Sequence, residues 1–196
     1  MTLVTPPVIA AGSLARTPQP VLRSGEPGEP GDLVLRPWVS ADLTDFVAAY
    51  QDPAICRWHT NRPASLDEAR AWFAAYAEDW AGERGGHWAV TRNDAVVGRI
   101  AVRGFNFAAG LAGCAYWVVP AARGRGVAPA ALRTVSEWAF DVGFHRLHLD
   151  HSTRNPASCR VATKAGFRPE GIERGAAVHE DGRHDMHLHA RVRGDD

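Results

Sequence analysis

A short glycine- and arginine-rich stretch has the clearest chemical potential in the sequence: residues 120–131, which read PAARGRGVAPAA. Glycine lets successive backbone N–H groups turn toward one anion, and arginine adds charge-assisted hydrogen bonds to phosphate oxygens. Similar compositions occur in plain glycine turns and in basic patches that bind nucleic acid. The stretch by itself leaves three interpretations open: a turn, a nucleic-acid patch or a phosphate cradle.

A second group of candidate residues begins at Asn155, where the pair Asn155–Pro156 predicts the start of a helix. Asn155 suits the N-cap of that helix. Ser158, in its first turn, carries a hydroxyl that could pass a proton or could bond only to backbone and solvent. Cys159 comes next, where a thiol pKa can fall, but a small packed side chain is the favoured interpretation.

The C-terminal region is rich in histidine, with four of these residues between positions 179 and 189: His179, His184, His187 and His189. Histidine is a common metal ligand, yet no set of neighbouring cysteines supports a zinc site here. Met186, Leu188 and Ala190 alternate with His187 and His189. This alternation predicts a strand with histidines on its more solvent-exposed face, and no metal.

Composition and charge restrict the class of protein. The chain has 196 residues, of which 45% are hydrophobic and 22% charged, which is typical of one globular domain. Lys plus Arg and Asp plus Glu both number 22, so the chain lacks the basic excess expected of a nucleic-acid-binding protein. We therefore expect no nucleic-acid partner.

Location and domain limits follow from similar arguments. The three cysteines are far apart, and no apolar run approaches the roughly 20 residues that span a bilayer. The N-terminus also lacks the basic region of a signal peptide. We expect a reducing, cytoplasmic location and no membrane contact. Residues 1–31 are rich in Pro and Gly and predict a flexible tail, whereas residues 32–196 predict one folded domain.

The periodicity of apolar residues predicts an α/β fold, with a mixed sheet of about six to seven strands flanked by about four helices. CAYWVV at residues 114–119, which is nearly all apolar, and RLHLDH at residues 146–151 are predicted strands joined by one helix, and should therefore be parallel neighbours. The glycine- and arginine-rich stretch then lies between the first of these strands and that helix. A helix N-terminus is a natural anion site, so the position favours the phosphate cradle.

With its flanking residues, this stretch resembles the acyl-CoA signature of the GCN5-related N-acetyltransferases. The matching residues are Tyr116–Pro120, followed by Arg123-x-x-Gly126-x-Ala128. Further resemblance runs from LVLRPW at residues 33–38 through NPAS at 155–158 and KAGF at 164–167 to DGRHD at 181–185. The ordered series is similar to the ribosomal-protein alanine acetyltransferase branch of that family. It implies a sheet in which two parallel strands splay apart and hold the cofactor arm between them.

The resemblance assigns expected roles to individual residues. Ser158 would protonate the leaving thiolate. Trp58 and His59 lie where the family often shapes its acceptor pocket. The implied acetyl-CoA contacts are Val118, Val119, Arg123, Gly124, Arg125, Gly126, Val127, Ala128 and Asn155.

The implied activity is transfer of an acetyl group from acetyl-CoA to a primary amine, either a protein N-terminus or a small molecule; a homodimer is left open. One residue departs from the branch, because Gly113 stands where a glutamate general base is expected. A water chain, Asp150 or His151, or the acceptor's own environment could then remove the proton. The departure also keeps open a noncatalytic CoA-binding module.

Overall fold

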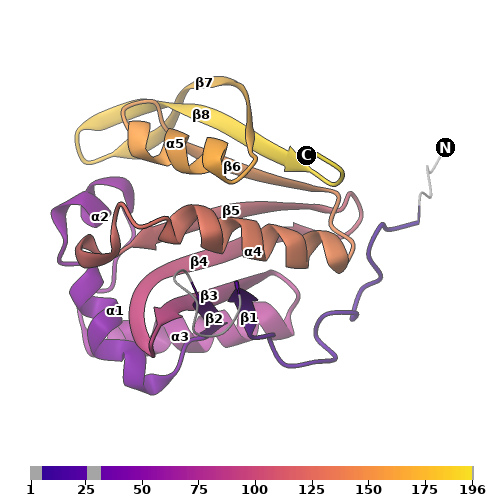
Figure 1. Ribbon diagram of the computed structural model, residues 1–196, viewed down its shortest axis with the longest axis horizontal. Helices are drawn as coiled ribbons and strands as arrows, with labels where there is room; N and C mark the ends of the chain where they lie inside the picture. Colours follow the sequence, from indigo (N-terminus) through magenta and orange to yellow (C-terminus); the bar gives the residue numbers. More distant parts are fainter. Residues whose placement is uncertain (1–5, 26–31, 196) are drawn as a thin grey trace.

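The computed structural model describes residues 6–25 and 32–195, which form one mixed sheet covered by helices on both faces (Figure 1). The eight strands lie in the order β1-β2-β3-β4-β5-β6-β8-β7. The strands are β1 (Leu22–Ser24), β2 (Leu33–Pro37), β3 (Gly85–Arg92), β4 (Ala95–Asn106), β5 (Leu111–Val118), β6 (Arg146–Ser152), β7 (Arg168–His179) and β8 (Gly182–Val192). The helices are α1 (Leu43–Ala49), α2 (Pro53–Trp58), α3 (Leu66–Ala81), α4 (Val127–Asp141) and α5 (Pro156–Lys164), with short 3₁₀ turns η1 (Ser40–Asp42) and η2 (Pro120–Ala122).

The α/β class and the mixed sheet are confirmed, with small differences in the number of elements. The sheet has eight strands because β1 forms within the segment expected to be a tail. Five α-helices are found because Asp52 caps the short helix α2, accepting the N–H of Ile55. No helix within the described residues combines the length and the apolarity that crossing a membrane requires.

The parallel pair of strands, β5 and β6, is the feature that positions the site. The two strands pair only at their beginnings, from Leu111 with Arg146 to Gly113 with His148. Every other neighbouring pair in the sheet is antiparallel. After Gly113 the two strands separate, so the sheet contains a fork between the second halves of β5 and β6.

Two apolar clusters occupy the two faces of the sheet. The larger contains α4 and α5 residues such as Leu132 and Ala162 together with Ile100 and Cys114 of the strands. The smaller joins α1 and α3 to Trp117 of β5, and its aromatic rings pack edge to face around the fully buried Phe46. In Figure 1, α4 lies across the strands in front while α3 lies behind them. Burial on both faces explains why β3, β4 and β5 are apolar in their central parts.

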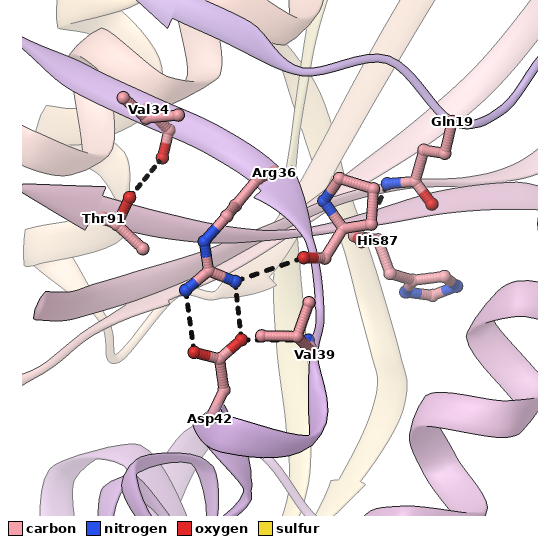
Figure 2. Close-up of polar contacts among 8 residues, drawn as sticks. Gln19, Val34, Arg36, Val39, Asp42, His87 and Thr91 are labelled. Atoms are coloured by element: carbon pink, nitrogen blue, oxygen red, sulfur yellow. Dashed lines mark hydrogen bonds and ion pairs between the residues drawn. The ribbon is translucent and has the colours of Figure 1, made fainter. Parts of the chain in front are cut away.

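An ion pair fixes the connection from β2 to α1. Arg36 donates to both carboxylate oxygens of Asp42, at 2.6 and 2.8 Å, and the Val39 N–H donates to the same carboxylate at 3.0 Å (Figure 2). Asp42 is only 4% exposed. The carboxylate therefore caps the turn that leads into α1.

Removing the Asp42 carboxylate should destabilise the chain by about 2–3 kcal/mol, because the Arg36 guanidinium would lose its acceptors while half-buried. We expect Asp42→Ala to lower the free energy of unfolding, measured by denaturant titration, by that amount. Asp45→Ala is the matched control: Asp45 is an exposed carboxylate in the first turn of α1. Its loss should change the free energy of unfolding by less than about 1 kcal/mol. Equal losses in the two variants would contradict this role of Asp42.

The N-terminal segment differs from the flexible tail predicted for residues 1–31. Within it, Ile9 and Leu14 are buried against the main apolar cluster. The Glu83 carboxylate accepts the backbone N–H groups of Gly12 and Leu14 at 2.5 and 2.7 Å. The described part of the segment, residues 6–25, is thus packed on the domain. The parts of the prediction that concern residues 1–5 and 26–31 lie outside the described residues.

Candidate active site at the fork of β5 and β6

A cavity of about 1100 Å³ follows the fork between β5 and β6. Its walls come from α2, α3, β4, β5, the start of α4, β6, α5 and β7. One end lies at the N-terminus of α4, and the other lies among the aromatic residues of α2 and α3. This volume is at the upper end of the range for small-molecule sites, so there is room for a long ligand and a second reactant.

The end at α4 has the geometry of an anion site. Gly124 and Gly126 both have left-handed backbone conformations, with φ of 74° and 75°, and both line the cavity. Gly126 is the N-cap of α4 and offers no capping side chain, so the first amides of the helix, at Val127 and Ala128, stay free for a ligand. These two residues line the cavity as well. The structure therefore brings the predicted cradle residues together.

The side chains of the two arginines of the stretch lie in different surroundings. Arg123 lines the cavity, but its guanidinium forms an ion pair with Asp52 and its Nε donates to the Val118 carbonyl at 3.1 Å. These two contacts of Arg123 hold the glycine- and arginine-rich loop against α2. Arg125 is exposed and does not line the cavity. Arg160 and Lys164 of α5 do line it, and no motif in the sequence marks these two basic residues of the helix that Asn155 begins.

Of the two predicted contact residues at the end of β5, Val118 and Val119, one has a backbone N–H that faces the fork. The Val119 N–H donates to the Val97 carbonyl at 3.0 Å, on the β4 side. Backbone groups alternate in direction along a strand, so the Val118 N–H faces the gap toward β6. Val118 is accordingly free to bind a ligand in the fork, whereas Val119 has already used its amide.

A pair of hydroxyl groups lies on the α5 side of the fork. The Ser158 Oγ and the Tyr116 hydroxyl are 2.7 Å apart, and both residues line the cavity. Burial raises the pKa of Tyr116 to about 12, so this phenol stays protonated at neutral pH. Asn155 is the N-cap of α5 and accepts the Ser158 N–H at 3.1 Å. Its amide NH₂ alone is left for a ligand. Tyr116 is part of the acyl-CoA motif, but no pattern in the sequence indicates its contact with Ser158.

The structure gives a physical reason for Gly113. A Cβ atom added there would lie 2.8 Å from Nε2 of His148, the register partner of Gly113 on β6. The imidazole of His148 therefore fills the space in which a glutamate side chain would begin. His148 does not line the cavity, so it does not replace the missing carboxylate.

His59 is better placed to handle a proton. Its Nε2 lies 3.2 Å from the Tyr116 carbonyl and must donate to it, so Nδ1 of the neutral ring keeps its lone pair. Burial, followed by the charges of Arg99 and Arg103, lowers the pKa of His59 to about 4. The ring is therefore neutral near pH 7. Trp58 lines the same part of the cavity, and its ring centroid lies 5.9 Å from that of His179.

Arginine side chains give this end of the cavity a positive charge. Arg99 is 9% exposed, and its NH2 lies 3.1 Å from Nδ1 of His87. Arg99 and Arg103 face the same side of the sheet as their β5 register partners, Trp117 and Gly113. Within the part of the chain that the structure describes, no carboxylate forms an ion pair with either arginine.

The histidines of β7 and β8 differ from the prediction. His184 and His189 are each 1% exposed, and His187 is half-buried, so they do not lie on a solvent-exposed face. His184 contacts the Ser152 hydroxyl at 2.8 Å and the Asp181 carboxylate at 2.7 Å. The alternation of residue types correctly predicted a strand, but helix α5 covers the face that was expected to be exposed to solvent.

Splayed parallel strands, a cradle of free amides at a helix N-terminus and a hydroxyl pair in one cavity define an acyl-CoA-dependent acyltransferase. Residues 32–168 match the acetyltransferase (GNAT) domain family, which is 137 of the 196 residues. The chain belongs to this family, as its motifs predicted.

Individual relatives agree with this assignment. A 60-residue part of the chain is 40% identical to the protein described as "Probable N-acetyltransferase YjcK" from Bacillus subtilis, and the match spans 30% of the chain and 33% of that protein. The chain thus matches about a third of the length of this relative.

Solved structures share the fold over most of the chain. Mycobacterium smegmatis RimJ, in complex with CoA-disulfide, has a TM-score of 0.77 at 21% identity, over 88% of this chain and 86% of that one. A ribosomal-protein alanine acetyltransferase from Vibrio fischeri has a TM-score of 0.76 at 16% identity, over 83% and 94%. At these identities the likeness concerns the fold alone.

Proposed function

We propose that this protein transfers an acetyl group from acetyl-CoA to a primary amine. The observation that carries the proposal is that one cavity holds both the cradle at Gly124–Ala128 and the Ser158–Tyr116 hydroxyl pair. The cradle suits a pyrophosphate, and the hydroxyl pair suits a leaving thiolate. The fork between the two requires a ligand with a long, narrow arm, such as pantetheine.

The reaction needs no covalent enzyme intermediate. The amine nitrogen attacks the thioester carbon, the carbonyl oxygen becomes an oxyanion, and the C–S bond then breaks to release CoA thiolate. The Val118 N–H points into the gap and is the donor that would stabilise the oxyanion. Ser158 Oγ would give its proton to the thiolate sulfur and take one from the Tyr116 hydroxyl, 2.7 Å away.

His59 Nδ1 is the group that would accept the amine proton. It lines the cavity on the α2 side, and its protonated Nε2 is held by the Tyr116 carbonyl. The acceptor would approach from the α1–α3 face, while the thiolate would be protonated from the α5 face. The two proton transfers would then take place on opposite sides of the sheet without competing. This assignment supplies a base where Gly113 provides none.

The arginines define the class of acceptor. Arg99 and Arg103 lie at the acceptor end of the cavity without a paired carboxylate among the described residues. Arg99 is buried and Arg103 is exposed, and the buried charge of Arg99 in particular is stabilised by a ligand of opposite sign. The acceptor is therefore a primary amine that also carries a carboxylate or phosphate group, whether it is a small molecule or the N-terminal residues of an acidic protein.

An acceptor screen tests the proposal. Purified protein is incubated with acetyl-CoA and matched pairs of amines, each pair being an amino acid or acidic peptide and its carboxamide form, and products are identified by mass spectrometry. We expect acetylated products, with kcat/KM at least about tenfold higher for the anionic member of each pair. Equal kcat/KM values for the anionic amine and its carboxamide form would overturn the proposed acceptor class. CoA binding with no product from any amine would favour a noncatalytic CoA-binding module.

Ser158→Ala should lower kcat by about tenfold while the Kd for CoA changes by less than about twofold, because a proton donor is lost and no phosphate contact is removed. Tyr116→Phe should show a smaller loss in kcat, since Ser158 can take a proton from water. Thr163→Ala is the matched control: its hydroxyl is also on α5 but bonds to the Cys159 carbonyl. Normal turnover by Ser158→Ala would exclude Ser158 from the mechanism.

Location and assembly follow as proposals of the same kind. Cys56, Cys114 and Cys159 are all free thiols, which fits the reducing cytoplasm expected from the sequence. The homodimer that the sequence left open, and the absence of a nucleic-acid partner, stay predictions. Size-exclusion chromatography with light scattering measures the first, and salt-dependent binding to DNA or RNA measures the second.

A further inference from the structure

Four side chains with metal-ligating atoms meet between α5 and the paired strands β6 and β8: His151, Cys159, His187 and His189. His151 and His187 are direct partners in the antiparallel register, and His189 faces the same side because side chains alternate along β8. Cys159 reaches the group from the first turns of α5, which lies over β6 (Figure 1). One donor atom from each residue lies within 4.8 Å of the other three.

The hydrogen bonds of the rings leave lone pairs directed into this group. Nδ1 of His151 lies 2.9 Å from the Ser152 carbonyl and therefore carries the ring proton, so Nε2 is an acceptor. This Nε2 and Nδ1 of His187 are both buried without a hydrogen-bond partner. A histidine that ligates a metal commonly donates its other ring N–H to a carbonyl in this way. Buried lone pairs without a donor or cation are costly.

His151 and His189 are both buried, at 6% and 1% exposed, and the neutral imidazole is the form that ligates a metal. His184, although fully buried, is not part of the group because Ser152 and Asp181 already occupy its two nitrogens. The cluster is therefore a distinct set of three imidazoles and one thiol.

We propose that His151, Cys159, His187 and His189 bind one divalent transition-metal ion, of which Zn²⁺ is the best match. Three nitrogens and one sulfur form a four-coordinate set of the tetrahedral, borderline-soft type that selects zinc over Mg²⁺ or Ca²⁺. Zinc bonds of about 2.0–2.3 Å place donor atoms about 3.3–3.7 Å apart. Small side-chain rotations would close the present cluster to that size.

The bound ion ties α5 to β6 and β8 and so fixes the first turns of the helix. Ser158 precedes Cys159, and His151 lines the cavity at the fork. All four coordination positions are filled by the chain, which is the pattern of a structural site rather than a catalytic one. The ion would hold the Asn155–Ser158 corner in position without touching the reactants. The sequence missed this set because its members come from three separate elements.

Metal analysis and a cobalt spectrum test the site on the full chain. After dialysis against a weak chelator, we expect wild type to retain about one Zn²⁺ per chain by mass spectrometry of the metal, and to melt at a higher temperature than EDTA-treated protein. Refilling with Co²⁺ should give the intense visible bands of a tetrahedral ion and a sulfur-to-cobalt charge-transfer band. Cys159→Ser should lose the charge-transfer band, and His189→Asn should weaken Zn²⁺ binding at least about 100-fold.

Matched variants separate the site from incidental binding by other histidines or thiols. Cys56→Ser and His179→Asn lie outside the cluster and should bind Zn²⁺ as wild type does. If refolding of His189→Asn is in doubt, circular dichroism and CoA binding report on its fold independently of the metal. Stoichiometry well below one, a Co²⁺ spectrum without the sulfur band, or equal Zn²⁺ affinity in cluster and control variants would overturn the proposal.

Discussion

Gly126→Asp should abolish measurable CoA binding, whereas Gly126→Asn should bind CoA within about tenfold of wild type. Gly126 has a φ of 75° and is the N-cap of α4, a left-handed position that Asn and Asp both tolerate. A Cβ atom there meets nothing within 4 Å, so neither side chain clashes with the protein. The two variants differ only by a negative charge where the pyrophosphate is expected to lie.

The expected difference follows from the charge alone. Two like charges about 4 Å apart repel by about 4 kcal/mol at the effective dielectric constant near a protein surface. That corresponds to about 1000-fold in Kd. Isothermal titration calorimetry with CoA measures it, and thermal melting confirms that the two variants are equally stable. Similar Kd values for the Asp and Asn variants would show that the cradle is not the phosphate site.

Local signals in the sequence were sufficient for most of the fold. An Asn–Asp pair favours a tight turn, and Asn93 and Asp94, with φ of 49° and 63°, form the turn between β3 and β4. Ser65 followed by Glu68 is the pattern of a capping box, and Ser65 caps α3 by accepting the Glu68 N–H. The pair Asp181–Gly182 predicts a two-residue hairpin turn, but the turn between β7 and β8 lies one residue earlier, because Gly182 pairs with His179. These features depend on a few neighbouring residues, which is why the sequence reveals them.

Features that depend on contacts between distant residues were not predictable in the same way. The packing of Leu14 depends on the backbone N–H groups that Glu83 accepts, 68 to 71 positions away. The reason for a glycine at position 113 is the neighbouring imidazole of His148, and only the parallel register of β5 and β6 brings these two residues together. The burial of His189 depends on α5. In each case the residue type was visible, but its partner was not.

The acceptor end of the site combines charge and proton transfer in one set of residues. Arg99 and Arg103 lower the pKa of His59, after burial, and thereby keep it a weak base in the free protein. An acceptor that brings a carboxylate or phosphate to these arginines would offset their charge. The pKa of His59 would then rise when the acceptor is bound. Base strength would thus increase only with the anionic acceptor in place, which links acceptor selection to catalysis.

His59→Gln should lower kcat/KM by about 10²–10³-fold and leave the Kd for CoA unchanged, because the proton acceptor proposed at the amine would be lost. Gln retains an N–H that can reach the Tyr116 carbonyl, so the local hydrogen bond is preserved. His145→Gln, which changes a histidine outside the cavity, is the control and should have wild-type activity. A His59→Gln variant with normal turnover would show that the proton leaves by another route.

The pH dependence provides a second readout for the same residue. Since the pKa of His59 is about 4, only about 1% of the free protein carries the imidazolium at pH 6, and kcat/KM, which reports the free protein, should show no inflection near 6.5. Nuclear magnetic resonance titration of the ring measures this pKa directly. Arg99→Met should raise it by removing a neighbouring positive charge, and a bound anionic acceptor should raise it in wild type. A His59 that titrates near 6.5 in every state would remove the coupling between acceptor charge and base strength.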